Sequence, residues 1–216
     1  MRWLTFDCYG TLVDWRTGIA QAIELVAPGK AASLLPLYYV HEAQVEAEAF
    51  RPYREVLGEA LLRAAAEADV ALPAGSERTL ADSLPDWPVF GDVGPALGRL
   101  RDDGWGLGIL SNVDSDLFAR TRERLPVPVD AVVTAAEVGS YKPASTHFLH
   151  FRETYKPDLQ VHVAQSWFHD IVPANRLGIT AIWINRLGED YDPSLAAAEL
   201  PDLLQLPATV SRITGQ

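Results

Sequence analysis

The chain has 216 residues, of which 48% are hydrophobic and 22% charged, an ordinary composition for one globular domain or for a core with a smaller insert. Its formal net charge of −11 argues against nucleic acid or an anionic membrane as the main partner, because both require a basic surface, but a small anionic substrate stays compatible. A single cysteine, Cys8, excludes an internal disulfide. The early charges at Arg2 and Asp7 predict that there is no signal peptide, and no apolar run approaches the ~20 residues of a membrane span. We therefore expect a soluble cytoplasmic protein.

The first expected element is a short buried strand that ends at an acid. Leu4 and Phe6 belong to an apolar run that stops at Asp7, and Gly10 and Thr11 follow it. In an open α/β sheet, ligands bind at the carboxyl ends of the strands. Gly10 allows a turn that brings backbone N–H groups near the carboxylate. A carboxylate held there can act as a nucleophile, although the alternative is a strand that simply ends in an acidic turn.

Residues 15–86 are predicted to be helical throughout, because apolar residues recur at spacings of three and four and no strand candidate occurs. Pro36 either kinks one of these helices or sets its start. The expected helices cover residues 15–26, about 31–49, 53–70 and about 77–84.

From residue 87 onwards, strands are expected to alternate with helices. Such alternation predicts a parallel sheet with right-handed crossovers. The tail contains a loop punctuated by prolines, a weak strand and a final helix. The expected strands cover residues 105–110, 131–134, 161–164 and 180–184, and the expected helices cover 95–101, 114–125, 146–155 and 173–177.

Polar residues that could join Asp7 follow several of these strands. Ser111 and Asn112 end the second strand, where a hydroxyl can donate to an anionic oxygen, although helix capping is the alternative. Lys142, in Gly-Ser-Tyr-Lys-Pro, would keep Asp7 ionised and offset charge in a transition state, whereas a lysine in a loop is more often merely solvated. Asp170 follows the strand that ends near residue 164 and is also a candidate helix cap.

The stretch Asp-Cys-Tyr-Gly-Thr-Leu-Val from Asp7, followed in order by Ser111, Lys142 and Asp170, resembles the four motifs of the haloacid dehalogenase-like hydrolases. The resemblance covers essentially the whole chain. It implies the fold class α/β, with a Rossmann-like parallel sheet core and an inserted all-helical cap domain. The core would comprise residues 1–14 and 87–216, and the cap residues 15–86.

Two departures from the phosphatases of this superfamily indicate the branch. Phosphatases carry a second aspartate two residues after the nucleophile, but this chain has Tyr9, which is not ionised near neutral pH at its reference pKa of ~10. Gln165 replaces an acid of the fourth motif, so Asp7, Tyr9 and Asp170 remain as the alternative Mg²⁺ site. Both changes favour chemistry without metal or other cofactor, and Asp-x-Tyr-Gly-Thr is similar to the L-2-haloacid dehalogenases (type II).

The resemblance implies a role for each matched residue. Asp7 would displace halide from a small 2-haloacid, and water would then hydrolyse the ester. Lys142 would pair with Asp7, while Asp170 and Ser166 would position the water. The substrate carboxylate would be bound by backbone N–H groups and hydroxyls of Cys8, Tyr9, Thr11, Ser111 and Asn112.

The pocket for the leaving group matches the dehalogenases least well. These enzymes hold the halide with a cap arginine, the motif II asparagine and an aromatic residue before the motif IV aspartate. Counting back from Phe50 places His41 at the arginine position, and His169 takes the aromatic position. Protonated histidines could hold an anion or serve another leaving group, and an exposed helix position is the alternative for His41. We expect Asp170 to raise the pKa of His169 and burial to oppose this effect.

The leading hypothesis is therefore a hydrolase of small 2-haloacids whose partners are an anionic organic acid and water. The alternatives are a Mg²⁺-dependent phosphatase of the same superfamily and a non-catalytic member that binds a small anion or a protein. The sequence leaves open a homodimer through the helical cap, the stereospecificity and the physiological substrate.

Overall fold

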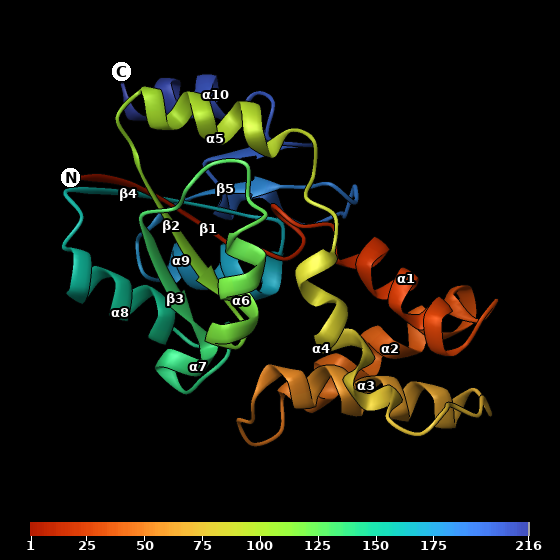
Figure 1. Cartoon of the computed structure of the whole chain (residues 1–216). Coiled ribbons are helices and arrows are strands. Elements are labelled where there is room, and N and C mark those ends of the chain that lie inside the picture. Colours follow the sequence, from red (N-terminus) through yellow and green to blue (C-terminus); the bar gives the residue numbers. More distant parts are fainter. Residues whose placement is uncertain (216) are drawn as a thin grey trace.

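A computed structural model describes residues 1–215 of the chain. Figure 1 shows a sheet with its covering helices on one side of the molecule and a second group of helices beside it. Within residues 1–215, the strands form one six-stranded parallel sheet in the order β3-β2-β1-β4-β5-β6, which confirms the predicted α/β class. The strands are β1 (Arg2–Phe6), β2 (Gly106–Ser111), β3 (Ala131–Thr134), β4 (Leu159–Ala164), β5 (Thr180–Ile184) and β6 (Ala198–Leu200).

The strand that leads to Asp7 lies at the centre of this sheet. β1 pairs on one side with β2, where Leu4 is opposite Leu107, and on the other side with β4, where Leu4 is opposite Val161. Leu4 and Phe6 are fully buried, as expected for a parallel strand covered on both faces. The strand order reverses at β1, and such a switch point is where open α/β sheets bind ligands.

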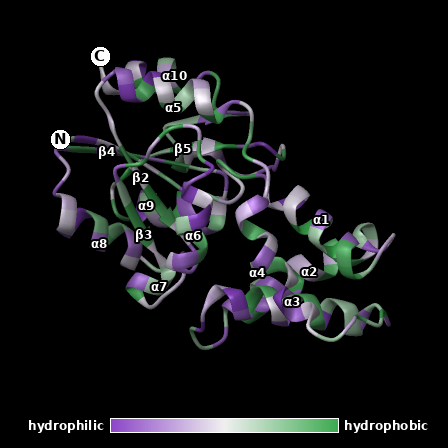
Figure 2. Cartoon of the chain, in the orientation of Figure 1, coloured by the Kyte–Doolittle hydropathy of each residue, from purple (hydrophilic) through white to green (hydrophobic). Residues whose placement is uncertain are grey.

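Helices cover both faces of the sheet. α5 and α10 lie side by side over one face, at the top of Figure 1, and α8 and α9 pack on the other. Figure 2 shows that the strands are largely hydrophobic, whereas hydrophobic and hydrophilic residues alternate along the helices. The helices of this part are α5 (Val93–Asp102), α6 (Ser115–Arg122), α7 (Ala135–Val138), α8 (Thr146–Tyr155), α9 (Val172–Arg176) and α10 (Leu206–Thr214). Nowhere in residues 1–215 does a helix have both the length and the apolar character needed to cross a membrane.

The segment after β1 is helical, as predicted. Asp14 begins it, because its carboxylate accepts a hydrogen bond from the N–H of Thr17 at 3.1 Å. The second helix starts at Ala31 and continues through Pro36, so this proline does not set its start. We keep residues 15–86 as the proposed cap. Its helices are α1 (Trp15–Val26), α2 (Ala31–Glu46), α3 (Tyr53–Glu67) and α4 (Thr79–Ser83), with 3₁₀ turns at Ser76–Arg78 and Leu84–Asp86.

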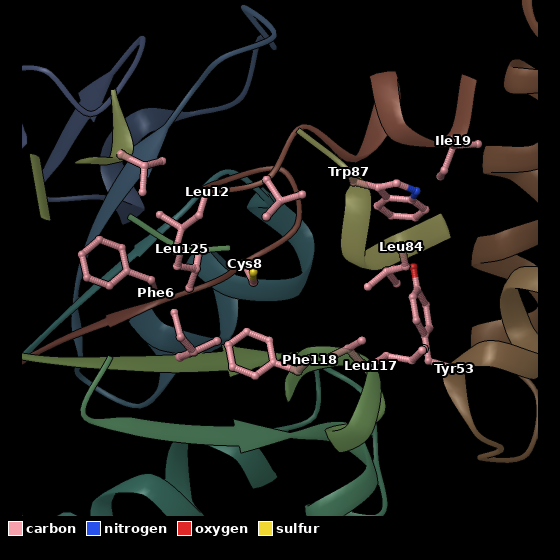
Figure 3. Close-up of a cluster of buried hydrophobic side chains, with 14 of the residues drawn as sticks. Phe6, Cys8, Leu12, Ile19, Tyr53, Leu84, Trp87, Leu117, Phe118 and Leu125 are labelled. Carbon is pink, nitrogen blue, oxygen red and sulfur yellow. The ribbon is translucent and has the colours of Figure 1, made fainter. Parts of the chain in front are cut away.

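The apolar core continues from the sheet into the cap. Figure 3 shows Phe6 near the sheet at one end of this cluster and Ile19, Trp87 and Tyr53 near the cap helices at the other. The ring of Trp87 packs directly on Gly18, where an added Cβ would lie 2.2 Å from the indole. A continuous core of this kind holds the cap helices against the carboxyl edge of the sheet.

A buried carboxylate also ties α3 to the core. Asp114 accepts hydrogen bonds from the backbone N–H groups of Tyr53 and Arg54 at 2.8 and 3.1 Å, and its side chain is 7% exposed. These two N–H groups belong to the first turn of α3, where a helix has no internal acceptor for them. Asp114, a residue of the proposed core domain, thus serves as an N-terminal cap for α3 in the proposed helical cap domain. This contact fixes Tyr53 over the sheet edge.

Gly58 in α3 is expected to tolerate no side chain. An added Cβ would lie 2.4 Å from the carbonyl oxygen of Glu77, which is backbone and cannot move away freely. Gly58→Ala should therefore lower the free energy of unfolding by ~1–3 kcal/mol, even though alanine is the better helix former. Gly98→Ala in α5 is the matched control, since nothing lies within 4 Å of that position, and it should raise stability by ~0.5–1 kcal/mol. Urea unfolding of both variants measures this, and a shift in the same direction would contradict the packing argument.

Candidate active site

The expected nucleophile Asp7 follows directly after β1. Its N–H donates to the carbonyl of Val163 at 3.1 Å, and its side chain is 10% exposed. The chain then turns back at Gly10, which has a φ of 106° and donates its N–H to the carbonyl of Val13 at 2.7 Å. An added Cβ at Gly10 would also lie 3.1 Å from the indole of Trp15. Both the backbone conformation and the space at this turn therefore require glycine.

Lys142 joins the two expected acids into one buried cluster. Its Nζ donates to Oδ1 of Asp7 at 2.9 Å, to Oδ1 of Asp170 at 2.7 Å and to the carbonyl of Leu110 at 2.8 Å. Burial by itself would lower the pKa of Lys142, but the charges of Asp170 and Asp7 outweigh burial and raise the pKa. One ammonium between two carboxylates leaves this cluster with a formal charge of about −1 when all three groups are ionised.

The two carboxylates of this cluster lie in different environments. Burial raises the pKa of Asp7, and the charge of Asp170 adds to this, while Lys142 and Thr11 oppose it. Burial would also raise the pKa of Asp170, but Lys142 and His162 outweigh it and lower the pKa to about 2. Such a separation assigns different roles to paired acids. Asp170 has the lower pKa of the two, and Asp7 has the higher.

A buried hydrogen-bond chain supports Asp170. Nε2 of His162, in β4, donates to Oδ1 of Asp170 at 3.1 Å, and Nδ1 lies 3.0 Å from the hydroxyl of Thr5. Because a carboxylate accepts only, the imidazole proton belongs on Nε2, and Nδ1 accepts from Thr5. Gln160 donates in turn to the Thr5 hydroxyl at 3.2 Å. His162 was not predicted as a site residue, although Thr5 and His162 are opposite each other on neighbouring strands and form an unusual polar pair for a sheet core.

The side chains of Thr11 and Cys8 are buried beside Asp7. The hydroxyl of Thr11 donates to Oδ2 of Asp7 at 2.9 Å and accepts from the N–H of Gln165 at 2.9 Å. Thr11 thus positions Asp7, and its side chain does not line the cavity over that residue, so its expected part in substrate binding stays a prediction. Burial raises the pKa of the Cys8 thiol, and Asp7 adds to this, so the thiol is unreactive. The expected contact of the Cys8 backbone N–H with the substrate stays a prediction.

A cavity of about 140 Å³ lies over Asp7, between the sheet edge and helices α2 and α3. At ~30 Å³ for each water in the liquid, it has room for about five waters, which suits a small organic acid. A larger hollow of about 720 Å³ between α5 and α10 contains none of the expected site residues. The expected residues that line the cavity over Asp7 are Asp7, Tyr9, Ser111, Asn112, Lys142, Ser166, His169 and Asp170. The unexpected ones are Trp15, Glu42, Glu46, Tyr53 and Gln165.

The end of β2 and the loop after it supply a hydroxyl without a hydrogen-bond partner in the described part of the chain, from Ser111, and an amide that is hydrogen-bonded to the backbone of Lys142, from Asn112. The Oγ of Ser111 is buried and has no hydrogen-bond partner within residues 1–215, so it can donate to an anionic ligand. The amide of Asn112 accepts from the N–H of Lys142 at 2.7 Å and donates to its carbonyl at 3.0 Å. Asn112 therefore holds the loop that carries Lys142. Neither residue caps α6, whose N-terminal cap position is Asp114.

The donor groups of the alternative Mg²⁺ site do not fit a divalent cation. The phenol of Tyr9 is 2.9 Å from the hydroxyl of Thr121, and burial raises its pKa well above 10.0. The ammonium of Lys142 already lies between the carboxylates of Asp7 and Asp170. Across residues 1–215, no group of three or more His, Cys, Asp or Glu side chains is placed to hold a metal. No metal-dependent step follows from this donor set.

His169 lies in a π-helical turn, Trp167–Ile171, and Ser166 is the residue before this turn. The Oγ of Ser166 accepts from the N–H of His169 at 3.1 Å. The Nε2 of His169 is 3.6 Å from a carboxylate oxygen of Glu46. Burial lowers the pKa of His169 and outweighs the charge of Asp170, which raises it, so the two opposing effects are those expected and burial is the larger. Its imidazole is neutral at neutral pH.

His41 lies outside the cavity, so its expected place in the leaving-group pocket is wrong. Its Nε2 is 2.8 Å from Glu67, and its Nδ1 is 3.2 Å from Gln44. The next residue, Glu42, is rotated by ~100° around the helix and lines the cavity together with Glu46. The cap therefore presents two acids to the cavity. Among the described residues that line it, no lysine or arginine other than Lys142 occurs.

Comparisons with known proteins show the family of the chain. A family model described as haloacid dehalogenase-like hydrolase matches residues 1–164. The (S)-2-haloacid dehalogenase of Pseudomonas putida is 25% identical over 199 residues, which cover 88% of this chain and 86% of the relative. The motifs that suggested this family from the sequence are thus supported along most of the chain.

Solved structures share the fold. The L-2-haloacid dehalogenase RSc1362 superposes with a TM-score of 0.87 at 27% identity, covering 98% of this chain and 99% of that one. An L-2-haloacid dehalogenase from Xanthobacter autotrophicus with chloropropionic acid covalently bound has a TM-score of 0.84 at 18% identity, covering 97% and 98%, a likeness of fold. Because the family model matches more than half of its length, this chain belongs to the haloacid dehalogenase-like hydrolases and is an enzyme.

Proposed function

We propose that this enzyme hydrolyses small 2-haloacids to 2-hydroxy acids through a covalent ester on Asp7, without a metal. The observation that carries the proposal is the way Asp7 is held. Lys142 fixes one of its oxygens at 2.9 Å and Thr11 fixes the other at 2.9 Å, on the floor of a small cavity. A carboxylate fixed in this way is oriented to attack a substrate carbon. Tyr9 supplies no second acid for phosphoryl chemistry.

In the first step, an oxygen of Asp7 forms a bond to C2 of the substrate. The carbon–halogen bond breaks, and halide leaves with the electron pair. The hydroxyl of Ser111, which has no partner within residues 1–215, binds the substrate carboxylate. The backbone N–H groups of Cys8, Tyr9 and Asn112 complete this anion site in our proposal.

In the second step, water adds to the carboxyl carbon of Asp7. The bond between this carbon and the ester oxygen breaks, one water proton goes to the product hydroxyl, and the other is released. Lys142, 2.9 Å from Oδ1 of Asp7, stabilises the oxyanion that forms on this carboxyl group. Asp170 and Ser166 position the water in this proposal. The oxygen of the water therefore ends in Asp7, and an oxygen of Asp7 ends in the product.

The proposal is tested by halide release from chloroacetate and 2-chloropropionate, alongside phosphate release from p-nitrophenyl phosphate, with Mg²⁺ and with EDTA. We expect halide release that EDTA does not reduce, and no phosphate release. A single turnover in H₂¹⁸O should place the label in the peptide that contains Asp7. Mg²⁺-dependent phosphate release would favour the phosphatase alternative, and absence of any turnover would favour a non-catalytic binding role.

A further inference from the structure

The wall of the cavity opposite Asp7 is formed by two acids of α2, Glu42 and Glu46. Oε1 of Glu42 accepts hydrogen bonds from the hydroxyls of Tyr53 at 2.6 Å and Tyr38 at 3.1 Å. Burial raises the pKa of Glu42, and the two phenol donors on one of its oxygens oppose this increase. The two tyrosines therefore fix an acceptor that faces the ligand space.

Glu46 lies one helical turn further along and is less well paired. Its side chain is 12% exposed, and the Nε2 of His169, at 3.6 Å, is beyond hydrogen-bond distance. Burial raises the pKa of Glu46 to about 8, Glu42 adds to this, and Lys142 opposes it. A carboxyl group in this position gains most from a ligand that brings a positive charge.

The side chains around the cavity include more acids than bases. Four carboxyl groups line it (Asp7, Glu42, Glu46 and Asp170), whereas Lys142 is the one lysine or arginine among the described lining residues. The ammonium of Lys142 is already shared between Asp7 and Asp170. Once Glu46 is ionised, above its pKa of about 8, a substrate with a carboxylate alone would add to this excess of negative charge at low dielectric. A zwitterionic substrate would add none.

Two polar atoms without partners in the described part of the chain favour a polar ligand in the same space. The Oγ of Ser111 and the Oδ2 of Asp170 are both buried, and neither has a hydrogen-bond partner within residues 1–215. Ser111 can bind the carboxylate end of a ligand, which leaves the opposite end facing α2. A neighbouring groove of about 430 Å³ shares Glu46, Lys142 and His169 with the cavity, so a ligand can approach Glu46 from outside.

We infer that Glu42 and Glu46 bind a protonated amine of the substrate, so that the preferred substrate is a small 2-haloacid with an ammonium group beyond the carbon that Asp7 attacks. This inference rests on the proposed function for the reacting end of the molecule. The amine would donate hydrogen bonds to Glu46 and to the free oxygen of Glu42, and its charge would balance theirs.

The test measures binding and turnover separately. Binding uses unreactive probes, 4-aminobutanoate, 4-hydroxybutanoate and butanoate, by calorimetry on the wild-type protein. We expect 4-aminobutanoate to bind at least ~10-fold more tightly than the other two, the lower range for a charge-assisted hydrogen bond. Glu46→Gln should abolish most of this preference. Glu67→Gln, on the outer side of the cap against His41, is the matched control and should keep it.

Turnover uses halide release from 2-chloro-4-aminobutanoate and 2-chlorobutanoate. A preference for the amine in kcat/KM that Glu46→Gln removes supports the inference. If halide is released from both substrates without preference, the inference is overturned and the proposed function holds. If no halide is released but 4-aminobutanoate binds through Glu46, the proposed function fails and the amine site stands. Binding of butanoate or 4-hydroxybutanoate as tightly as the amine, or no binding of any probe, overturns the inference.

The pH dependence gives an independent readout. Binding of a cation favours ionised Glu46, so affinity for 4-aminobutanoate should rise as the pH increases towards about 8 and above, while Glu46→Gln shows no such rise. Glu42, Lys142, Asp170 and His169 also face Glu46, and all four remain in the variant. If protonated Glu46 instead donates to a departing halide, turnover of 2-chlorobutanoate falls over the same pH range, and this would refute the amine site.

Discussion

Asp7→Asn is expected to abolish halide release while the protein stays folded. Loss of the nucleophile should reduce kcat by roughly 10⁴–10⁶-fold, the range seen when a covalent nucleophile is removed. Stability should hardly fall, because asparagine keeps the volume, the amide is neutral, and burial makes the ionised form of Asp7 unfavourable in the folded state. The remaining pair of Lys142 and Asp170 is still balanced in charge.

Halide release and urea unfolding of the same preparation measure both effects. Asp103→Asn, an exposed aspartate paired with Arg99, is the control and should keep full activity. Mass spectrometry must show that position 7 is still asparagine, because deamidation would restore the acid. More than a few per cent of activity without deamidation would exclude covalent catalysis by Asp7.

Lys142→Ala should impair both catalysis and folding. Loss of one preorganised charge at the oxyanion is expected to cost ~3–4 kcal/mol of transition-state stabilisation. Removal of the ammonium also leaves Asp7 and Asp170 buried without their cation, which should cost ~3–5 kcal/mol of folding free energy. In the variant, burial holds the pKa values of both carboxyl groups above their unfolded values. Protonation then favours the folded state, so the loss of stability should shrink as the pH falls.

Kinetics at saturating substrate and unfolding curves at several pH values test this expectation. Lys30→Ala, at an exposed lysine just before α2, is the control and should change neither the kinetics nor the stability. Wild-type kinetics in Lys142→Ala would show that the lysine is a structural residue of the loop. A stability deficit that grows towards low pH would contradict the assigned charges of the cluster.

Much of the sheet could be predicted because local pattern and burial agree there. The bounds of β3, β5 and α8 are those expected from residues 131–134, 180–184 and 146–155. The ends of α2 and α3 were placed about three residues too late, because alanines continue the helical pattern past both ends, and after α3 the chain turns at Asp69, which has a φ of 53°. The short helix α7 and the π-helical turn at Trp167–Ile171 were not predicted, since neither contains enough residues to show a period.

Position relative to the strands decides which site residues could be predicted from the sequence. Asp7, Lys142 and Asp170 follow strands directly or lie in the loops after them, and the carboxyl ends of parallel strands meet at one edge. Glu42 and Glu46 lie on a helix, where an error of one residue in register turns the side chain by ~100°. Packing of α2 on α3 and the core decides that rotation, and counting from Phe50 cannot. His162 was missed because an isolated histidine in an apolar strand is commonly just a buried residue.

The central position of β1 has a consequence for how the enzyme matures during translation. β1 is synthesised before both of its partner strands. Leu4 can come to lie opposite Leu107 only after β2 is synthesised, and opposite Val161 only after β4 is synthesised. The cap helices contact one another locally and can form in the meantime, whereas such distant strand pairs form slowly. Until β4 leaves the ribosome, β1 has an unpaired apolar edge that invites aggregation. The chain therefore becomes soluble and completes the site of its nucleophile at the same late stage of synthesis. Incomplete chains that end before β4 should be bound by chaperones or degraded by proteases more often than complete chains.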